Sequence, residues 1–137
     1  MPDFFQNGPI GTIHQLRDRD LSDLEQDLAQ WGKKSPIALV VPCLFSELEG
    51  EALPRIVSEL ASADYLDEIV IGLDNASREQ FEVAKKFFSQ LPQKHCILWQ
   101  DGPLLQEVNH SIEALGFSLG EPGKGKNVWF CLGYLLS

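Results

Sequence analysis

A chain of 137 residues, of which 44% are hydrophobic, is long enough for one domain with a real core and too short for two. The net charge of −9 and the isoelectric point near 4.6 oppose binding to nucleic acid or to an anionic membrane surface, because both would repel the chain. No apolar run approaches the roughly 20 residues of a spanning helix, and the polar start lacks the pattern of a signal peptide. We therefore expect a cytoplasmic protein with neither a nucleic-acid nor a membrane partner.

Residues 1–34 are predicted to form a polar N-terminal extension with one helix. Ser22 and Glu25 have the spacing of a capping box, in which two side chains bond the backbone at the start of a helix. Four large apolar side chains share one helical stripe, namely Leu21, Leu24, Leu28 and Trp31. The pattern indicates an added helix that packs onto the core formed by the rest of the chain.

Beyond the extension, apolar runs without polar alternation are separated by segments with helical periodicity. Such runs are typical of strands that are covered on both faces. Strands are expected at residues 37–41, 69–73 and 96–99, and helices at residues 53–63, 77–91, 104–115 and 127–136. Ser77 and Gln80 have capping-box spacing at the start of the second of these helices. This order predicts an α/β fold, Rossmann-like, with a mostly parallel sheet and helices on both faces.

Polar residues follow the first two predicted strands, at the end of the sheet where parallel sheets bind ligands. Asp74 could accept hydrogen bonds from a ribose or a base, with Asn75 beside it, but an ordinary turn before the next helix explains both residues equally well. Glu47 could act similarly after the first strand. There too a local explanation stays open, since Ser46 and Glu49 fit a capping box.

A cationic segment rich in glycine precedes the last predicted helix. Gly123 and Gly125 would let the backbone approach a ligand, and Lys124 would offer a positive charge to phosphate beside the unpaired N–H groups of a helix start. The segment lacks the glycine spacing and the following Ser or Thr of a Walker loop. Two interpretations stay open, a contact to a diphosphate and a solvated turn.

The remaining side chains favour neither a transition-metal site nor nucleophilic catalysis. The histidines at positions 14, 95 and 110 do not lie at ligand spacing from cysteines or carboxylates, and no serine has the surroundings of a hydrolase nucleophile. The cysteines at positions 43, 96 and 131 are widely separated in apolar contexts, which indicates buried thiols in a reducing compartment. The tryptophans at positions 31, 99 and 129 lie in apolar stripes typical of a core.

Three segments together resemble a known family. They are Val40-Val41-Pro42-Cys43-Leu44, Ile71-Gly72-Leu73-Asp74-Asn75-Ala76-Ser77 and Pro122-Gly123-Lys124-Gly125-Lys126. Their order is similar to that in the N-terminal half of GT-A glycosyltransferases, above all the glucosyl-3-phosphoglycerate synthase and mannosylglycerate synthase group, in which the Pro-Gly-Lys-Gly turn is the most specific mark. Residues 11–16 also resemble the segment before the first strand in that group, so the resemblance covers almost the whole chain.

The resemblance implies that residues 35–137 form a nucleotide-sugar-binding α/β domain. Its site would consist of Pro42, Cys43, Leu44, Glu47, Asp74, Asn75, Gly123, Lys124 and Gly125. The residues after the first strand would line the nucleoside, Glu47 or its neighbour would contact the base or ribose, and Asp74 with Asn75 would hold the uridine or its equivalent. Lys124 would lie against the nucleotide. The implied reaction is a retaining transfer of a hexose from a nucleotide diphosphate sugar to glycerate, phosphoglycerate or a similar small acceptor.

The resemblance also implies that this chain lacks part of the enzyme. In the family an Asp-x-Asp motif coordinates the Mg²⁺ or Mn²⁺ that bridges the diphosphate, but no Asp or Glu follows Glu121 here. We therefore expect a domain truncated at its C-terminal end, with no catalytic or metal-binding residue of its own and negligible activity alone. An exposed sheet edge and a partly uncovered last helix, at Val128, Phe130, Leu132 and Leu135, would favour self-association.

Two other interpretations remain open. A complete small α/β binding or protein-interaction module without catalysis would suit the acidity of the chain and its lack of catalytic constellations. A fragment of a nucleotidyltransferase would share the sheet and a basic glycine-containing turn, but such enzymes usually place that turn soon after the first strand, and here it lies far downstream.

Overall fold

A computed structural model describes residues 20–137 of the chain. The expected lead-in at residues 11–16, the histidine at position 14 and most of the predicted extension lie outside the described residues. No helix within the described part is long and apolar enough to cross a membrane.

Nine elements follow one another along the described chain. They are α1 (Leu21–Gly32), β1 (Ala38–Leu44), the 3₁₀ helix η1 (Phe45–Glu49), α2 (Ala52–Leu60), β2 (Glu68–Asp74), α3 (Arg78–Phe88), β3 (Lys94–Trp99), α4 (Pro103–Ala114) and α5 (Lys124–Leu135). The three strands pair in parallel in the order β1-β2-β3, with β2 in the centre. The predicted α/β, Rossmann-like class is therefore confirmed for the described residues.

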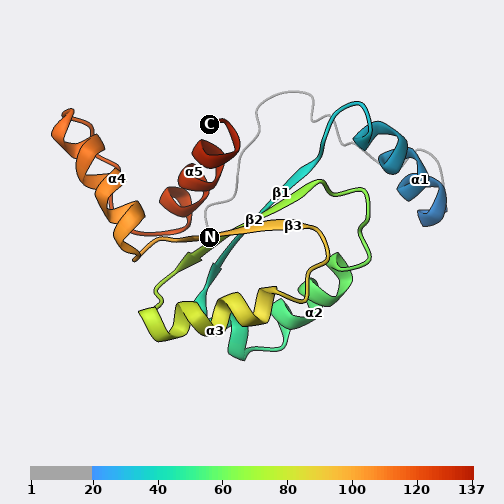
Figure 1. Ribbon diagram of the computed structural model, residues 1–137, viewed down its shortest axis with the longest axis horizontal. Coiled ribbons are helices and arrows are strands. Elements are labelled where there is room, and N and C mark those ends of the chain that lie inside the picture. The colour runs from blue at the N-terminus through green and yellow to red at the C-terminus, as the bar shows by residue number, and fades with distance from the viewer. Residues whose placement is uncertain (1–19) are drawn as a thin grey trace, which may run out of the picture.

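The helices cover both faces of the sheet, as predicted. In Figure 1, α2 and α3 lie on one side of the strands, and α5 lies on the other side, where it contacts β1 and β2. Leu53 and Val57 of α2 and Ala84 and Phe88 of α3 are buried in the main core. Every residue of β2 before Asp74 is buried, which explains its apolar run without alternation. α1 and α4 extend away from the sheet (Figure 1).

The predicted capping box at Ser77 is present. The Ser77 hydroxyl accepts a hydrogen bond from the Gln80 N–H at 3.2 Å, and the Gln80 side chain accepts one from the Ser77 N–H at 2.8 Å. The capping box predicted at Ser22 is wrong, because Asp20 occupies the cap position of α1 and accepts a bond from the Ser22 N–H at 3.4 Å. An aspartate directly before the first helical residue competes successfully for that role.

This difference between the two serines gives a stability prediction. We expect Ser77→Ala to lower the free energy of unfolding by about 1 kcal/mol. The Gln80 N–H loses its acceptor, and the hydrogen bond from the N–H of residue 77 to the Gln80 side chain loses its geometry. Ser22→Ala is the matched control and should change it by less than about 0.5 kcal/mol. Urea unfolding followed by circular dichroism measures both, and equal losses would contradict this assignment of the caps.

The expectation that all three tryptophans lie in the core is wrong for two of them. Trp31 is 71% exposed and Trp129 is 50% exposed, whereas Trp99 is partly buried and stacks on Phe81 with ring centroids 4.8 Å apart. Trp31 is exposed because α1 buries none of its residues against the described part of the chain. An apolar stripe on a helix therefore does not establish here that the stripe is covered.

Candidate functional site

A cavity of about 340 Å³ opens where β1 and β2 end and α5 begins. It is lined by Pro42, Cys43, Leu44, Glu47, Asp74, Gly123, Lys124 and Asn127. Seven of the nine residues predicted from the sequence are among them. Asn75 and Gly125 do not line the cavity, and Asn127 was not predicted. The cavity thus lies at the carboxyl ends of parallel strands, where such sheets bind ligands.

The end of β1 and the first turn of η1 are held together by Glu47. One oxygen of its carboxylate accepts a hydrogen bond from the Leu44 N–H at 2.7 Å. The capping box proposed for Ser46 and Glu49 is wrong, since the acidic residue that caps this turn is Glu47 itself. Glu47 therefore has a local structural role and also faces the cavity.

Cys43 forms part of the wall next to Glu47. Burial, and secondly the charge of Glu47, raise the pKa of its thiol to about 12. The side chain therefore stays an uncharged thiol at neutral pH and behaves as a small apolar group. Together with Pro42 it gives the cavity an apolar surface of the kind against which a planar ring can pack.

The turn after β2 is fixed by two carboxylates. Asp74 accepts a hydrogen bond from the Asn75 N–H at 2.9 Å, and Asp101 accepts one from the Ala76 N–H at 2.9 Å. Asn75 has a left-handed backbone with φ of 56°, which Asn tolerates better than most residues. The local turn proposed as the alternative for Asp74 and Asn75 is therefore present. Asp74 nevertheless lines the cavity, whereas Asn75 forms part of the turn and does not line it.

The cationic segment forms the start of α5 rather than a turn before it. The helix begins at Lys124 with Gly123 in the cap position, three residues before the predicted start at Asn127. No side chain of the described residues caps this start by a hydrogen bond. Its backbone N–H groups and the helix dipole favour an anion, and Lys124 adds a full positive charge at the same place.

Asn127 is the site residue that sequence reasoning missed. It is 3% exposed, and its side-chain N–H donates to the carbonyl oxygen of Gly72 in β2 at 2.8 Å. The sequence held one signal of this contact, because a glycine inside a buried strand often marks the close approach of another element. Gly72 has that role here, but the pattern alone does not say which residue approaches.

A second, smaller chamber of about 60 Å³ adjoins the first. It shares Asp74, Gly123 and Asn127 with the larger cavity and is otherwise lined by Gln100, Asp101, Gln106, Pro122 and Lys126. Carboxylates, amides and an ammonium group surround it. Such a set can exchange hydrogen bonds with hydroxyl groups of a ligand that extends from the larger cavity.

The described residues offer no ready site for a divalent metal. Between residues 20 and 137, no three side chains of His, Cys, Asp and Glu gather closely enough to hold an ion. Two carboxylates line the larger cavity, and one oxygen of Glu47 already accepts a backbone N–H. Mg²⁺ is usually held by one or two carboxylates together with phosphate and water, and among the residues that line this cavity only Glu47 and Asp74 carry carboxylates.

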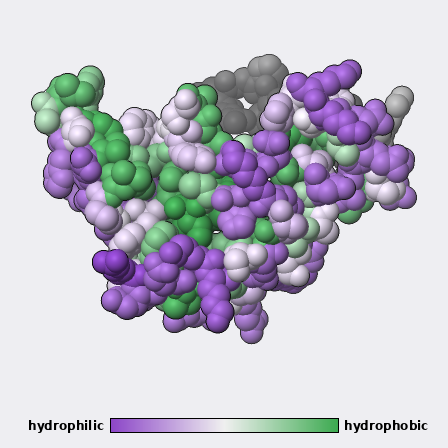
Figure 2. Space-filling view, viewed as in Figure 1, coloured by the Kyte–Doolittle hydropathy of each residue, from purple (hydrophilic) through white to green (hydrophobic). Residues whose placement is uncertain are grey.

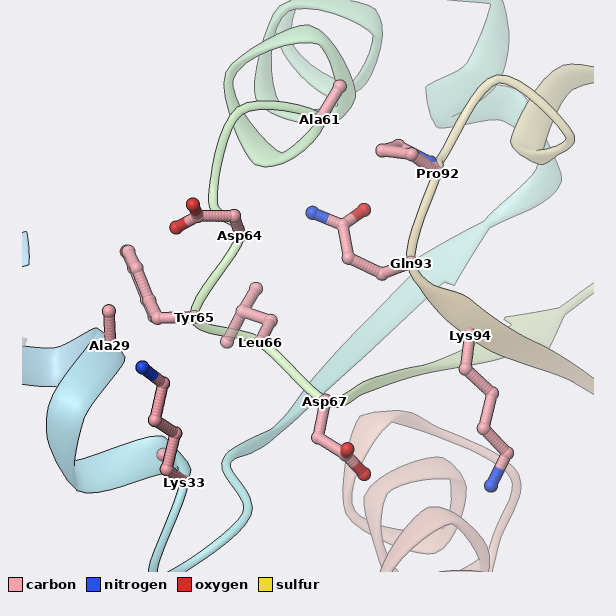
Figure 3. Close-up of a pocket in the computed structure, with 11 residues that line it drawn as sticks. Ala29, Lys33, Ala61, Asp64, Tyr65, Leu66, Asp67, Pro92, Gln93 and Lys94 are labelled. Carbon is pink, nitrogen blue, oxygen red and sulfur yellow. The ribbon is translucent and has the colours of Figure 1, made fainter.

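Another cavity, of about 720 Å³, lies at the opposite end of the strands (Figure 3). Its charged lining side chains are Lys33, Asp64, Asp67 and Lys94, of both signs. Gln93 in its wall bonds the carbonyl oxygens of Leu60 and Ala63 at 2.7 and 3.0 Å, which ties two loops together. None of the predicted site residues lines this cavity, and it lies away from the carboxyl ends of the strands, so we do not consider it the candidate site.

The fold and the cavity together define a Rossmann-like α/β unit of the class that binds ligands at a helix start beyond the strand ends. Comparison with known proteins is more specific. The chain is 43% identical over 137 residues to a glucosyl-3-phosphoglycerate synthase of Persephonella marina, an alignment that covers all of this chain and 34% of the relative. A second glucosyl-3-phosphoglycerate synthase, from Methanococcoides burtonii, is 31% identical over 132 residues, which are 96% of this chain and 32% of the relative.

The similarity confirms the resemblance to glucosyl-3-phosphoglycerate synthases that the motifs predicted, and it makes the chain homologous to part of these two relatives. The chain spans about a third of the length of the curated relatives it matches. No family model matches the chain. No solved structure matches it either.

Proposed function

We propose that this chain is the donor-binding portion of a retaining glycosyltransferase. The whole enzyme would transfer a hexose from a nucleotide diphosphate sugar to glycerate, phosphoglycerate or a similar small acceptor. The observation that supports the proposal most is the gathering of seven residues from three distant segments around one cavity beyond the strand ends. The names of the two relatives support the same reaction class.

Each part of the cavity suits one part of such a donor. Pro42, Cys43 and Leu44 would pack against the nucleoside, and Glu47 or Asp74 would accept hydrogen bonds from its base or ribose. The diphosphate would lie against Lys124 and the N–H groups at the start of α5, where a positive end of the helix and an ammonium group act together. Gly123 carries no side chain that would block this approach.

The catalytic step would need groups that this chain does not supply. The intact enzyme is expected to bind Mg²⁺ or Mn²⁺ through an acidic motif outside this sequence, and the metal would neutralise the leaving diphosphate. We therefore propose that the chain alone binds a donor but transfers no sugar at a measurable rate. The proposed location is the cytoplasm, where nucleotide sugars and phosphorylated acceptors would meet the enzyme.

Calorimetric titration with UDP-glucose, GDP-mannose and ADP-glucose, each with and without Mg²⁺, tests the proposal. We expect one of them to bind, with little help from the metal, and Lys124→Ala to weaken that binding about tenfold or more because a charge-assisted contact to phosphate is lost. Asp74→Ala should weaken it by a similar factor. Lys86→Ala on α3 removes the same charge away from the cavity and is the matched control.

A folded chain that binds none of these compounds at millimolar concentration would contradict the proposal. A second function would then be favoured, a small α/β module that binds another protein. The observation for it is the exposed apolar surface of α4 and the residues after it, with Leu104 71%, Leu115 75% and Phe117 67% exposed. Surfaces of this kind often mark a protein interface.

A further inference from the structure

The buried residue Asn127 connects the start of α5 to the central strand. Its backbone N–H donates to the carbonyl oxygen of Gly123 at 3.0 Å, which closes the first turn of the helix. Its side-chain N–H donates to the carbonyl oxygen of Gly72 at 2.8 Å. Asn127 therefore bonds the cap residue of α5 through its backbone and the central strand through its side chain.

The contact at Gly72 brings α5 close to the backbone of β2. A Cβ atom built on Gly72 would lie 1.7 Å from the Asn127 side-chain oxygen and 2.8 Å from the Cys131 sulfur. Cys131 lies one turn further along α5 and is fully buried. The helix therefore packs directly on the backbone of the strand, and Gly72 is the residue that permits this.

Lys124 lies three residues before Asn127, so both side chains lie on the same side of the helix. Both line the 340 Å³ cavity, but they differ in exposure, since Lys124 is exposed and Asn127 is 3% exposed. The Asn127 oxygen has long contacts to Gln100 and Cys131, at 3.4 and 3.6 Å. Its strongest side-chain contact goes to the strand, so Asn127 is suited to orient the helix start.

From this geometry we propose that Asn127 is the positioning residue of the donor site. Through its bond to Gly72 it sets where Lys124 and the N–H groups of the first turn of α5 stand relative to Asp74 at the end of β2. The inference rests on the proposed function, because it concerns the binding of the diphosphate of a nucleotide sugar. A shift of about 1 Å in such a group is enough to weaken its contact with a bound ligand strongly.

A double-mutant cycle tests this inference in the complete chain. The parent, Asn127→Ala, Lys124→Ala and the double variant are titrated with the nucleotide sugar that the parent binds. We expect Asn127→Ala to weaken binding about tenfold, and Lys124→Ala to have a much smaller effect in the Asn127→Ala background than in the parent. A structural role unrelated to Lys124 would give additive losses instead.

Asn109→Ala is the matched control, because Asn109 is also a buried helical asparagine but lies outside both cavities. It should lower the stability of the fold without changing the affinity. Should Asn127→Ala not fold, Asn127→Leu takes its place, since it keeps a similar size, removes the donor to Gly72 and adds no charge beside the proposed diphosphate site. Circular dichroism and urea unfolding establish that each variant is folded before it is titrated.

The outcomes separate the inference from the proposed function. If the parent binds and the losses of affinity are additive, or Asn127→Ala loses no affinity, the positioning role of Asn127 is overturned. The proposed donor site is then unaffected. Failure of the parent to bind any nucleotide sugar overturns both. Non-additive losses, together with an unchanged affinity of Asn109→Ala, support the positioning role.

Discussion

Gly72→Ala is expected to destabilise the chain by about 3 kcal/mol or more, a large part of the stability of a small domain. The added methyl group would lie 1.7 Å from the Asn127 oxygen, 2.7 Å from the Asn127 side-chain carbon and 2.8 Å from the Cys131 sulfur. All of these atoms are buried beside a central strand. The helix would have to move away from the sheet, which would expose apolar surface and break the bond from Asn127.

Two further variants make this prediction specific. Gly133→Ala on α5, where nothing lies within 4 Å of the new Cβ atom, should leave stability unchanged or raise it by about 0.5 kcal/mol, because alanine favours a helix. Adding Asn127→Ala to Gly72→Ala should restore part of the loss, since it removes the two closest atoms. Urea unfolding measures all of these changes. A Gly72→Ala variant as stable as the parent would show that the helix does not pack as closely as described.

The order of the elements could be predicted from the sequence because each element has a local cause. The apolar run of β2 and the capping box at Ser77 are of this kind, and both are present. The boundaries differ from those predicted. β1 continues through Pro42 to Leu44, because a proline is tolerated in a strand at the edge of a sheet and β1 is an edge strand of the described sheet.

The start of α5 shows where local propensity fails. Gly123, Lys124 and Gly125 favour a turn by their composition, yet the helix includes the last two of them. The helix packs on β1 and β2 and buries Phe130 and Cys131, and this tertiary packing outweighs the weak propensity of glycine. Such tertiary contacts are not encoded in a short window of sequence.

The same distinction separates the site residues that were predicted from the one that was missed. Residues after two neighbouring parallel strands must lie at the same edge of the sheet, so Pro42 and Asp74 could be placed together from their positions alone. Asn127 could not, since its partner Gly72 lies 55 residues earlier in the chain. Its role depends on how closely a helix approaches a strand, which periodicity does not determine.

Self-association of the isolated chain is the second large effect that we expect. Figure 2 shows hydrophobic surface over α4 and part of α5. The exposed apolar side chains of these two helices and of the residues after them include those of Leu104, Leu115, Phe117, Trp129, Leu132 and Leu136. The expected exposure of Phe130 on the last helix was wrong, because Phe130 packs inward and is 6% exposed. An exposed apolar surface of this kind can bring two copies of a chain together.

Phe117→Glu should shift the chain toward the monomer, because it replaces an exposed apolar side chain by a charge that a contact with another copy would have to bury. Sedimentation velocity at roughly 1 to 100 μM, the concentration range in which weak contacts form, would reveal the shift. Leu21→Glu on α1 adds the same charge on the opposite side of the molecule and is the control, since Leu21 is similarly exposed at 68%.

If Phe117→Glu associates as strongly as the parent, the contact lies at an open edge of the sheet, where unpaired backbone groups of β1 or β3 would join two copies. A parent chain that stays monomeric throughout would instead mean that the exposed apolar side chains of α4 are too dispersed to form an interface.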